Sequence, residues 1–281
     1  MSAQVGGPIR LIVTDLDGTL LSSAHVVTPF TAQAVQEAIA RGVLFTVATG
    51  KTYPSTTGLI QQFGINIPLI CGNGTQVFAP DGTLLYEAPI PRDVAIEAVQ
   101  LAQAGGFTPI VYLKMGLLAQ AWDANVAEVV AHHEPAPEIA DDLQAALAGR
   151  YTPYKLILMS QDRASIDDFD TQLRQAFEGR AQVLRSGLAS VVEVLPLGVT
   201  KATALTHILD YLGLSAEATM SFGDNCNDLD MIRMSGIGVA MGHAPEDVRS
   251  GANYVTGTND EDGVGHAIRR FVLDAQPVGT R

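Results

Sequence analysis

Two aspartates that stand two residues apart, Asp15 and Asp17, directly follow the apolar run LIVT. Two more, Asp224 and Asp228, lie in the segment GDNCND that follows a second apolar run, ATMSF. Carboxylates that meet in a partly desolvated crevice repel one another strongly unless a cation lies between them. A hard divalent ion with oxygen ligands would meet that need, which favours magnesium over zinc. The acidic residues therefore predict a magnesium site.

A hydroxyl group, a glycine turn and a lysine stand beside the ends of two further elements. Thr49 and Gly50 follow the apolar run VLFTVA, and Lys201 stands at a helix start that Thr200 can cap. Together with magnesium, these groups can bind a phosphate. Because ligands of open parallel sheets lie beyond the carboxyl ends of the strands, we expect all of these residues at one edge. The leading interpretation is phosphoryl chemistry.

The two aspartates of the first segment can divide this chemistry between them. Asp15 at the strand end can attack phosphorus and form an acyl phosphate, which splits one displacement into two easier steps. Asp17 can protonate the leaving oxygen and then take a proton from the hydrolytic water. Each segment alone has an ordinary explanation, since Asp-Gly is a common turn and Lys201 alone would be a solvated helix cation. Their joint occurrence at successive strand ends favours a real site.

Short apolar runs alternate with amphipathic segments along both ends of the chain. The runs are LIVT, VLFTVA, PLIC, ATMSF, IGVAM and NYVT, which is typical of parallel strands covered on both faces. Between the first two, the sequence predicts a helix with Thr28 as N-cap, Pro29 at the first position and Gly42 as the stop. The fold class we expect is α/β, with a doubly wound, mostly parallel, Rossmann-like core sheet.

The middle of the chain has longer apolar runs that follow the predicted hairpin QVFAPDGTLLYEA. FTPIVYL, YKLILMS, AQVLRS and SVVEVLP alternate there with helical segments, which predicts an inserted α+β cap domain. We expect the cap at residues 85–194, a core domain formed by 1–84 and 195–281, and hinges at the two junctions. The Pro- and acid-rich stretch 132–142 is expected to be an exposed loop without a chemical role.

The composition limits the partners of the protein. The chain has 281 residues and a formal net charge of -13, which repels phosphate backbones and anionic headgroups. No stretch approaches the roughly 18 apolar residues of a membrane span, the first residues lack a leader pattern, and two cysteines are too few for a disulfide framework. We expect a cytoplasmic protein with neither a nucleic-acid nor a membrane partner. Its oligomeric state stays open between a monomer and a weak dimer.

In these segments the chain resembles the haloacid dehalogenase-like (HAD) hydrolases, in particular the Cof-type subfamily with a type IIB (C2) cap. DLDGTLL resembles the first motif of the family, VATGK the second, LGVTKATAL the third and SFGDNCNDLDMI the fourth. The resemblance covers the whole core. The long interval between Thr49 and Lys201 has room for a C2 cap, whereas one helix and one strand fill the interval between Asp17 and Thr49.

The resemblance implies a magnesium-dependent phosphatase that works through an aspartyl-phosphate intermediate, with Asp15 as the nucleophile and Asp17 as the general acid and base. It implies that Mg²⁺ is held by the Asp15 carboxylate, the Asp17 backbone carbonyl and the Asp224 carboxylate, with Asp228 supporting them. The implied phosphate-binding groups are the backbone N–H of Leu16 together with Thr49, Gly50, Lys201 and Asn227.

The expected substrate is a small phosphorylated metabolite, such as a sugar phosphate or a similar phosphomonoester. Two alternatives stay open: a phosphomutase of the same superfamily, and a catalytically silent small-molecule-binding protein. Lys51 stands where related sequences commonly have arginine, so its role is not predicted. The cap residues that contact the leaving group are not identified by any motif; the candidates, for each of which a core or surface role is expected, are Tyr112, Lys114, Trp122, His132 and His133.

Overall fold

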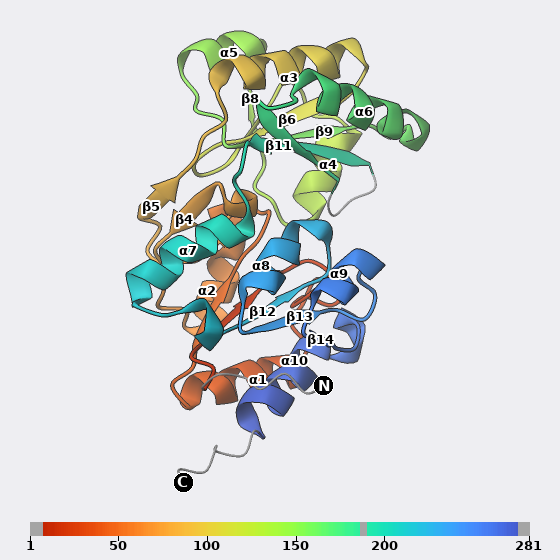
Figure 1. Cartoon of the computed structure of the whole chain (residues 1–281). Helices are drawn as coiled ribbons and strands as arrows, with labels where there is room; N and C mark the ends of the chain where they lie inside the picture. The colour runs from red at the N-terminus through yellow and green to blue at the C-terminus, as the bar shows by residue number, and fades with distance from the viewer. Residues whose placement is uncertain (1–7, 186–189, 275–281) are drawn as a thin grey trace.

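The computed structural model describes residues 8–185 and 190–274. The first seven residues, part of the segment expected to lack a leader pattern, lie outside this range, as does Ser186 at the end of the predicted strand AQVLRS. Figure 1 shows two bodies, one above the other, joined by chain segments that pass between them. Among the described helices, none has the length and apolar character needed to cross a membrane.

The lower body is built on a parallel sheet with the strand order β14-β13-β12-β1-β2. Its strands are β1 (Leu11–Thr14), β2 (Leu44–Val47), β12 (Thr219–Gly223), β13 (Ile237–Ala240) and β14 (Tyr254–Val255). β1 is an interior strand, because Leu11 pairs with Leu44 on one side and with Thr219 on the other. The predicted α/β fold with a parallel core sheet is confirmed.

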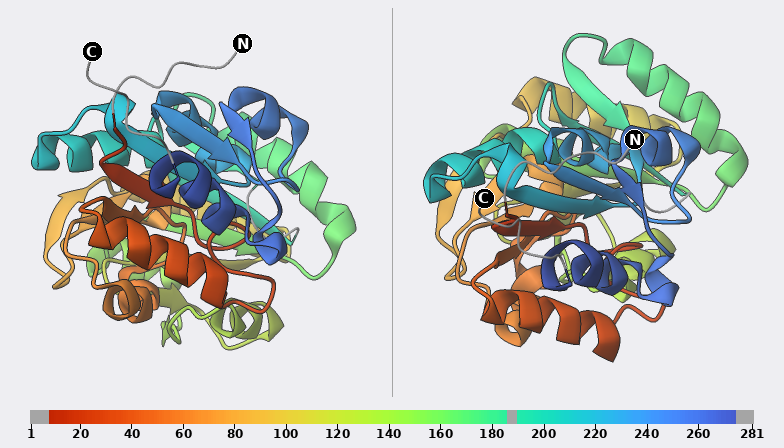
Figure 2. Two further views of the ribbon diagram at one scale, coloured as in Figure 1. Left: turned by 90° about the horizontal axis from the view of Figure 1, so that it is seen from below. Right: turned by 60° about the horizontal axis from the view of Figure 1, so that its bottom comes forward.

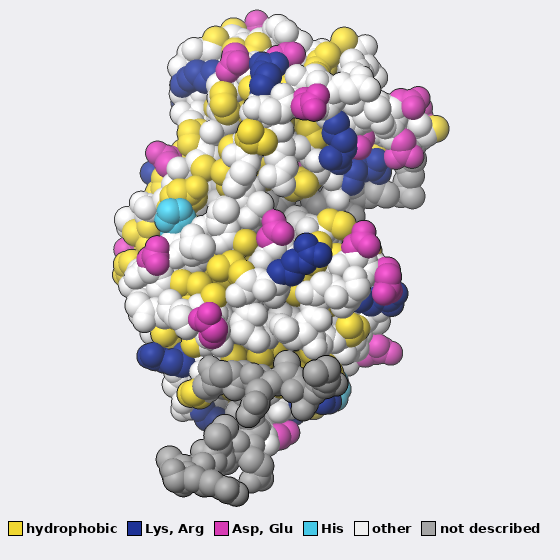
Figure 3. Space-filling model, in the orientation of Figure 1, with side chains coloured by type: hydrophobic (Ala, Val, Ile, Leu, Met, Phe, Trp, Pro, Cys, Tyr) yellow, Lys and Arg dark blue, Asp and Glu magenta, His cyan; other side chains and the backbone are white. Residues whose placement is uncertain are grey.

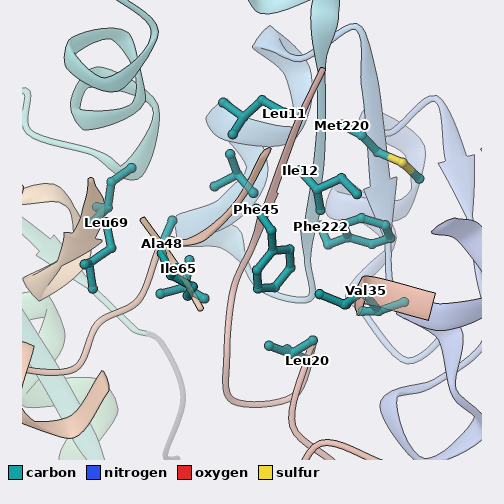
Figure 4. Packing of buried hydrophobic residues seen from close by; sticks show 14 of the residues in the cluster. Leu11, Ile12, Leu20, Val35, Phe45, Ala48, Ile65, Leu69, Met220 and Phe222 are labelled. Atoms are coloured by element: carbon teal, nitrogen blue, oxygen red, sulfur yellow. The ribbon is translucent and has the colours of Figure 1, made fainter. Parts of the chain in front are cut away.

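Helices cover both faces of this sheet, as Figure 2 shows. α1 (Pro29–Ala40) and α10 (Gly263–Ile268) pack together on one face; α7 (Lys201–Leu212), α8 (Leu229–Met234) and α9 (Glu246–Gly251) lie on the other. Thr28 caps α1 as predicted, since its hydroxyl accepts the N–H of Thr31. Buried side chains of β1, β2, β12 and α1 form one apolar cluster, part of which Figure 4 shows.

The run PLIC departs from its prediction as a strand of the parallel sheet. It forms β3 (Leu69–Cys71), which pairs antiparallel with β4 (Gln76–Phe78), and β4 pairs with β5 (Leu84–Glu87). A tight turn at Gly72–Gly74 brings β4 back along β3, so the backbone groups of β3 pair with those of β4. A single parallel bridge between Ala48 and Ile70 still links β3 to the end of β2.

The upper body contains a second sheet with the strand order β10-β11-β9-β6-β7-β8. Its strands are β6 (Thr108–Tyr112), β7 (Leu117–Ala119), β8 (Glu138–Ile139), β9 (Lys155–Met159), β10 (Ala181–Leu184) and β11 (Val191–Pro196). All its pairings are antiparallel except that of β7 with β8. The helices of this body are α3 (Arg92–Ala104), α4 (Ala124–Ala131), α5 (Leu143–Gly149) and α6 (Ile166–Ala176).

Alternation along the strands of this second sheet separates two apolar clusters. Leu156 and Leu158 pack with α3, α5 and α6, whereas Ile157 and Met159 pack with α4. The predicted domain boundaries at 85 and 194 fall inside β5 and β11. We therefore propose the predicted division into core and cap with its boundaries moved to the ends of these strands, after Glu87 and after Pro196. The names core and cap are used below in this sense.

Shorter helical segments complete the described chain. They are α2 (Thr57–Phe63) and the turns Tyr53–Thr56, Gly72–Gly74, Arg163–Ser165, Ala216–Ala218, Cys226–Asp228, Asn259–Glu261 and Arg269–Leu273. On the face of the molecule that Figure 3 shows, acidic and basic side chains are interspersed. The negative net charge is thus not gathered into one patch on that face.

The start of α7 is fixed from two sides. Thr200 caps the helix as predicted, because its hydroxyl accepts the N–H of Thr203 while the Thr203 hydroxyl accepts the N–H of Thr200. Gly74, with φ of +100°, lies so close that an added Cβ would stand 2.2 Å from the carbonyl oxygen of Thr200. Only glycine fits at this position. The Gly72–Gly74 turn therefore sets where the next residue, Lys201, enters the site.

Replacing Gly74 tests this contact. Gly74→Ala should lower the free energy of unfolding by more than Gly106→Ala, since both residues have positive φ but Gly106 has open space around its Cβ position. We expect a loss of roughly 1–2 kcal/mol at Gly106 from the backbone conformation alone. At Gly74 overpacking should add roughly 1–3 kcal/mol. Urea denaturation measures both, and equal losses would contradict the close packing against α7.

Candidate active site

The carboxyl ends of β1, β2 and β12 meet at the edge of the core sheet that faces the cap. A cavity of about 330 Å³ lies at this edge. On the core side its lining includes Asp15, Asp17, Gly50, Asp224 and Asn227. On the cap side it includes Tyr112, Val129, His132, Ile157 and Val191. The structure therefore brings the predicted strand-end residues together, and it adds a cap wall of apolar and polar side chains above them.

The Lys201 side chain lies at the centre of the charged groups. Its Nζ is 2.7 Å from Oδ1 of Asp15 and 2.6 Å from Oδ1 of Asp228. Lys201 is 1% exposed and Asp228 is fully buried. Burial alone would lower the pKa of Lys201, but the two carboxylates outweigh burial and raise its pKa. The lysine is thus held as a cation that neutralises part of the acidic cluster.

Asp228 is anchored by the backbone as well as by the lysine. Its second oxygen, Oδ2, accepts the N–H groups of Asp224 and Asn225, each at 3.0 Å. This turn holds Asp224 next to the first motif. Gly18, with φ of +77°, makes room there, because an added Cβ would lie 2.7 Å from Oδ2 of Asp224. The glycine of DLDG is therefore required by the approach of a carboxylate from a distant strand.

Asp15, Asp224 and Asp228 offer carboxylate oxygens that all lie within 4.8 Å of one another. Burial, followed by the neighbouring carboxylates, raises the pKa of Asp15 well above its usual range despite Lys201. Burial and Asp228 likewise raise the pKa of Asp224 to about 6. One ammonium does not balance three carboxylates. The donor set fits a hard divalent cation, because all of its ligand atoms are oxygens.

The Asp17 carboxylate is engaged separately from this cluster. Its Oδ2 is 3.1 Å from Nζ of Lys51, and its Oδ1 is 3.7 Å from Nδ1 of His25. Lys51 also donates a hydrogen bond to the backbone carbonyl of His132 in the cap. The lysine whose role the sequence left open therefore joins Asp17 to the cap. His25 was not identified from the sequence, where nothing distinguishes it from a loop histidine.

The predicted phosphate-binding residues are placed at two depths. Gly50 and Asn227 line the cavity, and Lys201 contacts Asp15. Thr49 is buried, and its hydroxyl accepts the backbone N–H of Lys51. Leu16 is also buried, and its carbonyl accepts the N–H groups of residues 19 and 21. Within the described chain, neither Thr49 nor Leu16 is among the lining residues. The roles of all five stay predictions.

The expectation of an exposed loop at residues 132–142 is wrong at Glu134. Glu134 is buried and accepts hydrogen bonds from the N–H and hydroxyl of Thr52 and from the hydroxyl of Ser55. These donors stand at the start of the helical turn Tyr53–Thr56, where backbone N–H groups lack helical partners and favour an anion. The stretch therefore fastens the cap to the core.

The structure places some of the candidate leaving-group residues at the cavity and others away from it. Tyr112 and His132 line the cavity, and the His133 ring lies 5.6 Å from that of His25. Lys114 lines a separate groove on the cap, and Trp122 is 57% exposed. Burial, followed by nearby Glu134 and Glu193, raises the pKa of Tyr112 well above its usual range.

Further residues that the sequence did not single out line the cavity, among them Asn73, Lys155 and Glu193. Asn73 has a left-handed backbone in the turn Gly72–Gly74, and the other two stand within β9 and β11. A lysine in YKLILM and a glutamate in VVEVLP interrupt otherwise apolar strands. That interruption is the signal by which the sequence could have indicated them.

The raised pKa values give the metal-free protein a defined pH dependence. Folded Asp224 has a pKa of about 6 against an ordinary 3.8, so the folded state binds a proton more tightly than the unfolded state does. The stability of the metal-free protein should therefore fall as the pH rises from about 3.8 through about 6. A divalent cation that binds the carboxylates should restore it, raising the thermal unfolding midpoint more at about pH 7.5 than at about pH 5.

Two variants control this measurement. Asp224→Asn removes one carboxylate, so it should stabilise the metal-free protein above about pH 6 and abolish the cation-dependent rise. Asp210→Asn changes an exposed carboxylate of α7 and should leave both effects as they are in the unmodified protein. A cation-dependent rise of equal size at both pH values would contradict the assignment.

Comparison with known proteins identifies a family to which the chain is similar. A family model described as haloacid dehalogenase-like hydrolase matches residues 12–268. An HMP-PP phosphatase of Serratia proteamaculans is 30% identical over 277 residues, which cover 94% of this chain and 95% of that protein. A 5-amino-6-(5-phospho-D-ribitylamino)uracil phosphatase of Bacillus subtilis is 28% identical over 265 residues, covering 94% and 96%.

Solved structures agree in fold over nearly the whole chain. A haloacid dehalogenase-like hydrolase from Bacteroides thetaiotaomicron has a TM-score of 0.82 at 26% identity, covering 93% of this chain and 99% of that one. A HAD subclass IIB sugar phosphatase also has a TM-score of 0.82, at 25% identity, covering 93% and 98%.

Proposed function

The chain belongs to the haloacid dehalogenase-like hydrolases, as a phosphatase of the Cof-type, and we propose that it hydrolyses a small phosphomonoester with magnesium through an aspartyl-phosphate. The observation that carries the proposal is the buried contact of Lys201 with Asp15 and Asp228. It holds one carboxylate at the end of β1 in a fixed position beside a set of oxygen ligands. The Asp17 carboxylate, two residues on, is held by different partners.

In the first step, Asp15 attacks phosphorus through the oxygen that Lys201 does not hold. An Asp15–phosphorus bond forms, the bond to the leaving oxygen breaks, and Asp17 gives that oxygen its proton. In the second step, water attacks phosphorus, Asp17 takes the proton of that water, and phosphate leaves with the Asp15 carboxylate restored. Lys51 and His25 orient Asp17 for both transfers.

Asp15, Asp224 and the backbone carbonyl of Asp17 would hold magnesium, with Asp228 behind them. Bound magnesium would neutralise charge on the phosphoryl oxygens. Gly50, Asn227 and Lys201 would then bind the phosphate, supported by Thr49 and the N–H of Leu16.

The substrate we propose is a small phosphorylated metabolite. The cavity of about 330 Å³ is at the small end of ligand pockets. The relatives named above act on a phosphorylated ribitylaminouracil, on HMP-PP and on a sugar phosphate. As part of the proposal we retain a cytoplasmic location and the absence of a nucleic-acid partner, which the net charge of -13 favours.

A panel of phosphorylated metabolites tests the reaction class. With magnesium present, we expect free phosphate to be released in proportion to the substrate consumed, and a chelator should stop the release. Formation of a phosphorylated isomer without free phosphate would identify a phosphomutase instead. No turnover of any ester with magnesium would favour a small-molecule-binding protein.

The two aspartates should differ in their variants. Asp15→Asn should abolish turnover while the fold, measured by circular dichroism, persists. Asp17→Asn should slow turnover by roughly 10²–10⁴-fold and allow the phosphoenzyme to be trapped by acid quench. Asp210→Asn, an exposed carboxylate, serves as the control and should turn over normally. Activity retained by Asp15→Asn would refute its role as the nucleophile.

A further inference from the structure

A lysine and a glutamate are buried in the cap sheet on the side that faces the core. Lys155 is 3% exposed and Glu193 is 6% exposed, and their charged atoms lie 3.4 Å apart. Nζ of Lys155 also lies 4.0 Å from the centre of the Tyr112 ring and donates a hydrogen bond to the carbonyl of Gly50 at 2.8 Å. The proposed chemical steps use neither residue. Burying such a pair is costly, which calls for an explanation.

Glu193 is connected to the phosphate site through Asn73. The Asn73 Nδ2 donates to Oε2 of Glu193 at 2.7 Å, and the Asn227 Nδ2 donates to Oδ1 of Asn73 at 3.0 Å. Asn73 is itself buried, and its left-handed backbone holds it in the turn Gly72–Gly74. A continuous chain of hydrogen bonds thus leads from a cap carboxylate to a core residue that lines the cavity.

Because a carboxylate only accepts hydrogen bonds, the hydrogen bonds that link Glu193, Asn73 and Asn227 all run in one direction. Glu193 as a carboxylate can only accept, so Asn73 must turn its amide nitrogen toward the cap and its oxygen toward Asn227. Asn227 must then donate one hydrogen of its Nδ2 to Oδ1 of Asn73. Turning either amide over would place oxygen against oxygen. The second hydrogen of the Asn227 amide remains for a phosphate oxygen, and Oδ1 of Asn227 is a buried acceptor without a hydrogen-bond partner in the described chain.

From this geometry we infer that Glu193 and Lys155 are positioning residues of the phosphate site, although they belong to the cap. Glu193 sets the orientation of the Asn227 amide through Asn73, and Lys155 holds the Gly50 peptide through its carbonyl. The phosphate site is therefore complete only while the cap lies against the core. This inference rests on the proposed function, in which Gly50 and Asn227 bind the phosphate.

Binding of a bare anion separates positioning from contact with the leaving group. We would titrate orthovanadate, which has no leaving group, into the magnesium-loaded protein by calorimetry. Glu193→Gln keeps the shape of the side chain, but its new amide can donate, so the amides of Asn73 and Asn227 can both turn over. Lys155→Met removes the hydrogen bond to the Gly50 carbonyl. We expect each variant to bind orthovanadate at least about tenfold more weakly and to lose kcat/KM by a similar factor for every ester. Glu138→Gln and Lys114→Met, two exposed cap positions, should match the unmodified protein.

A double variant that exchanges the carboxylate and the amide between positions 193 and 73 provides the most direct control. Asn73→Asp should lose anion affinity, because it places a second carboxylate against Glu193. Combined with Glu193→Gln it should recover most of that affinity, because the new glutamine can donate to the new aspartate, which still accepts from Asn227. The double variant also tests the inference if one of the single variants fails to fold. Failure of the folded double variant to recover affinity would overturn the inference.

The remaining outcomes separate this inference from the proposed function. Unchanged orthovanadate affinity in Glu193→Gln and Lys155→Met, with losses that vary from ester to ester, would show that the two residues contact the leaving group and would refute the positioning role. If the unmodified protein hydrolysed no ester at all, the proposed function would fail. The anion titration would still test the positioning.

Discussion

The structure of the site depends on one buried cation. Lys201 is the first residue of α7, and its ammonium lies between a carboxylate that follows β1 and another that follows β12. Carboxylates this close together and this buried would otherwise repel one another and favour protonation. The position of Lys201 is in turn fixed by the Thr200 cap and by the close contact with Gly74. Strand order, helix capping and a glycine turn therefore all serve the placement of one charge.

The cap completes the site without supplying the reacting groups. Its sheet turns Ile157 and Val191 toward the cavity, while Glu134 and the backbone of His132 bind the segment that follows β2. The groups proposed to react therefore lie at the edge of the core sheet. The walls that meet the rest of the substrate come from a separate body. One core chemistry can then serve different leaving groups through changes in the cap.

Local signals in the sequence were sufficient for most of the core. The strand ends that carry Asp15 and Asp224, and the caps at Thr28 and Thr200, depend on neighbouring residues and were predicted correctly. The contacts of Glu134 with Ser55, of Lys155 with Gly50 and of Asn73 with Glu193 join segments 79 to 120 residues apart. Such contacts follow from how two bodies pack, for which one sequence has no periodic signal. The partner of β3 was likewise decided by a tight turn that short apolar runs do not reveal.

The position of β1 between β2 and β12 has a consequence for how the protein is made. On one side β1 pairs with β12, which is synthesised only after the entire cap, and α1 packs on α10 near the end of the described chain. The cap sheet, by contrast, is formed by one continuous stretch of chain. On the ribosome, the cap can therefore fold as a unit while the first strands of the core still wait for their partners. The pairing of β1 with β12 can form only after the entire cap sequence has been synthesised.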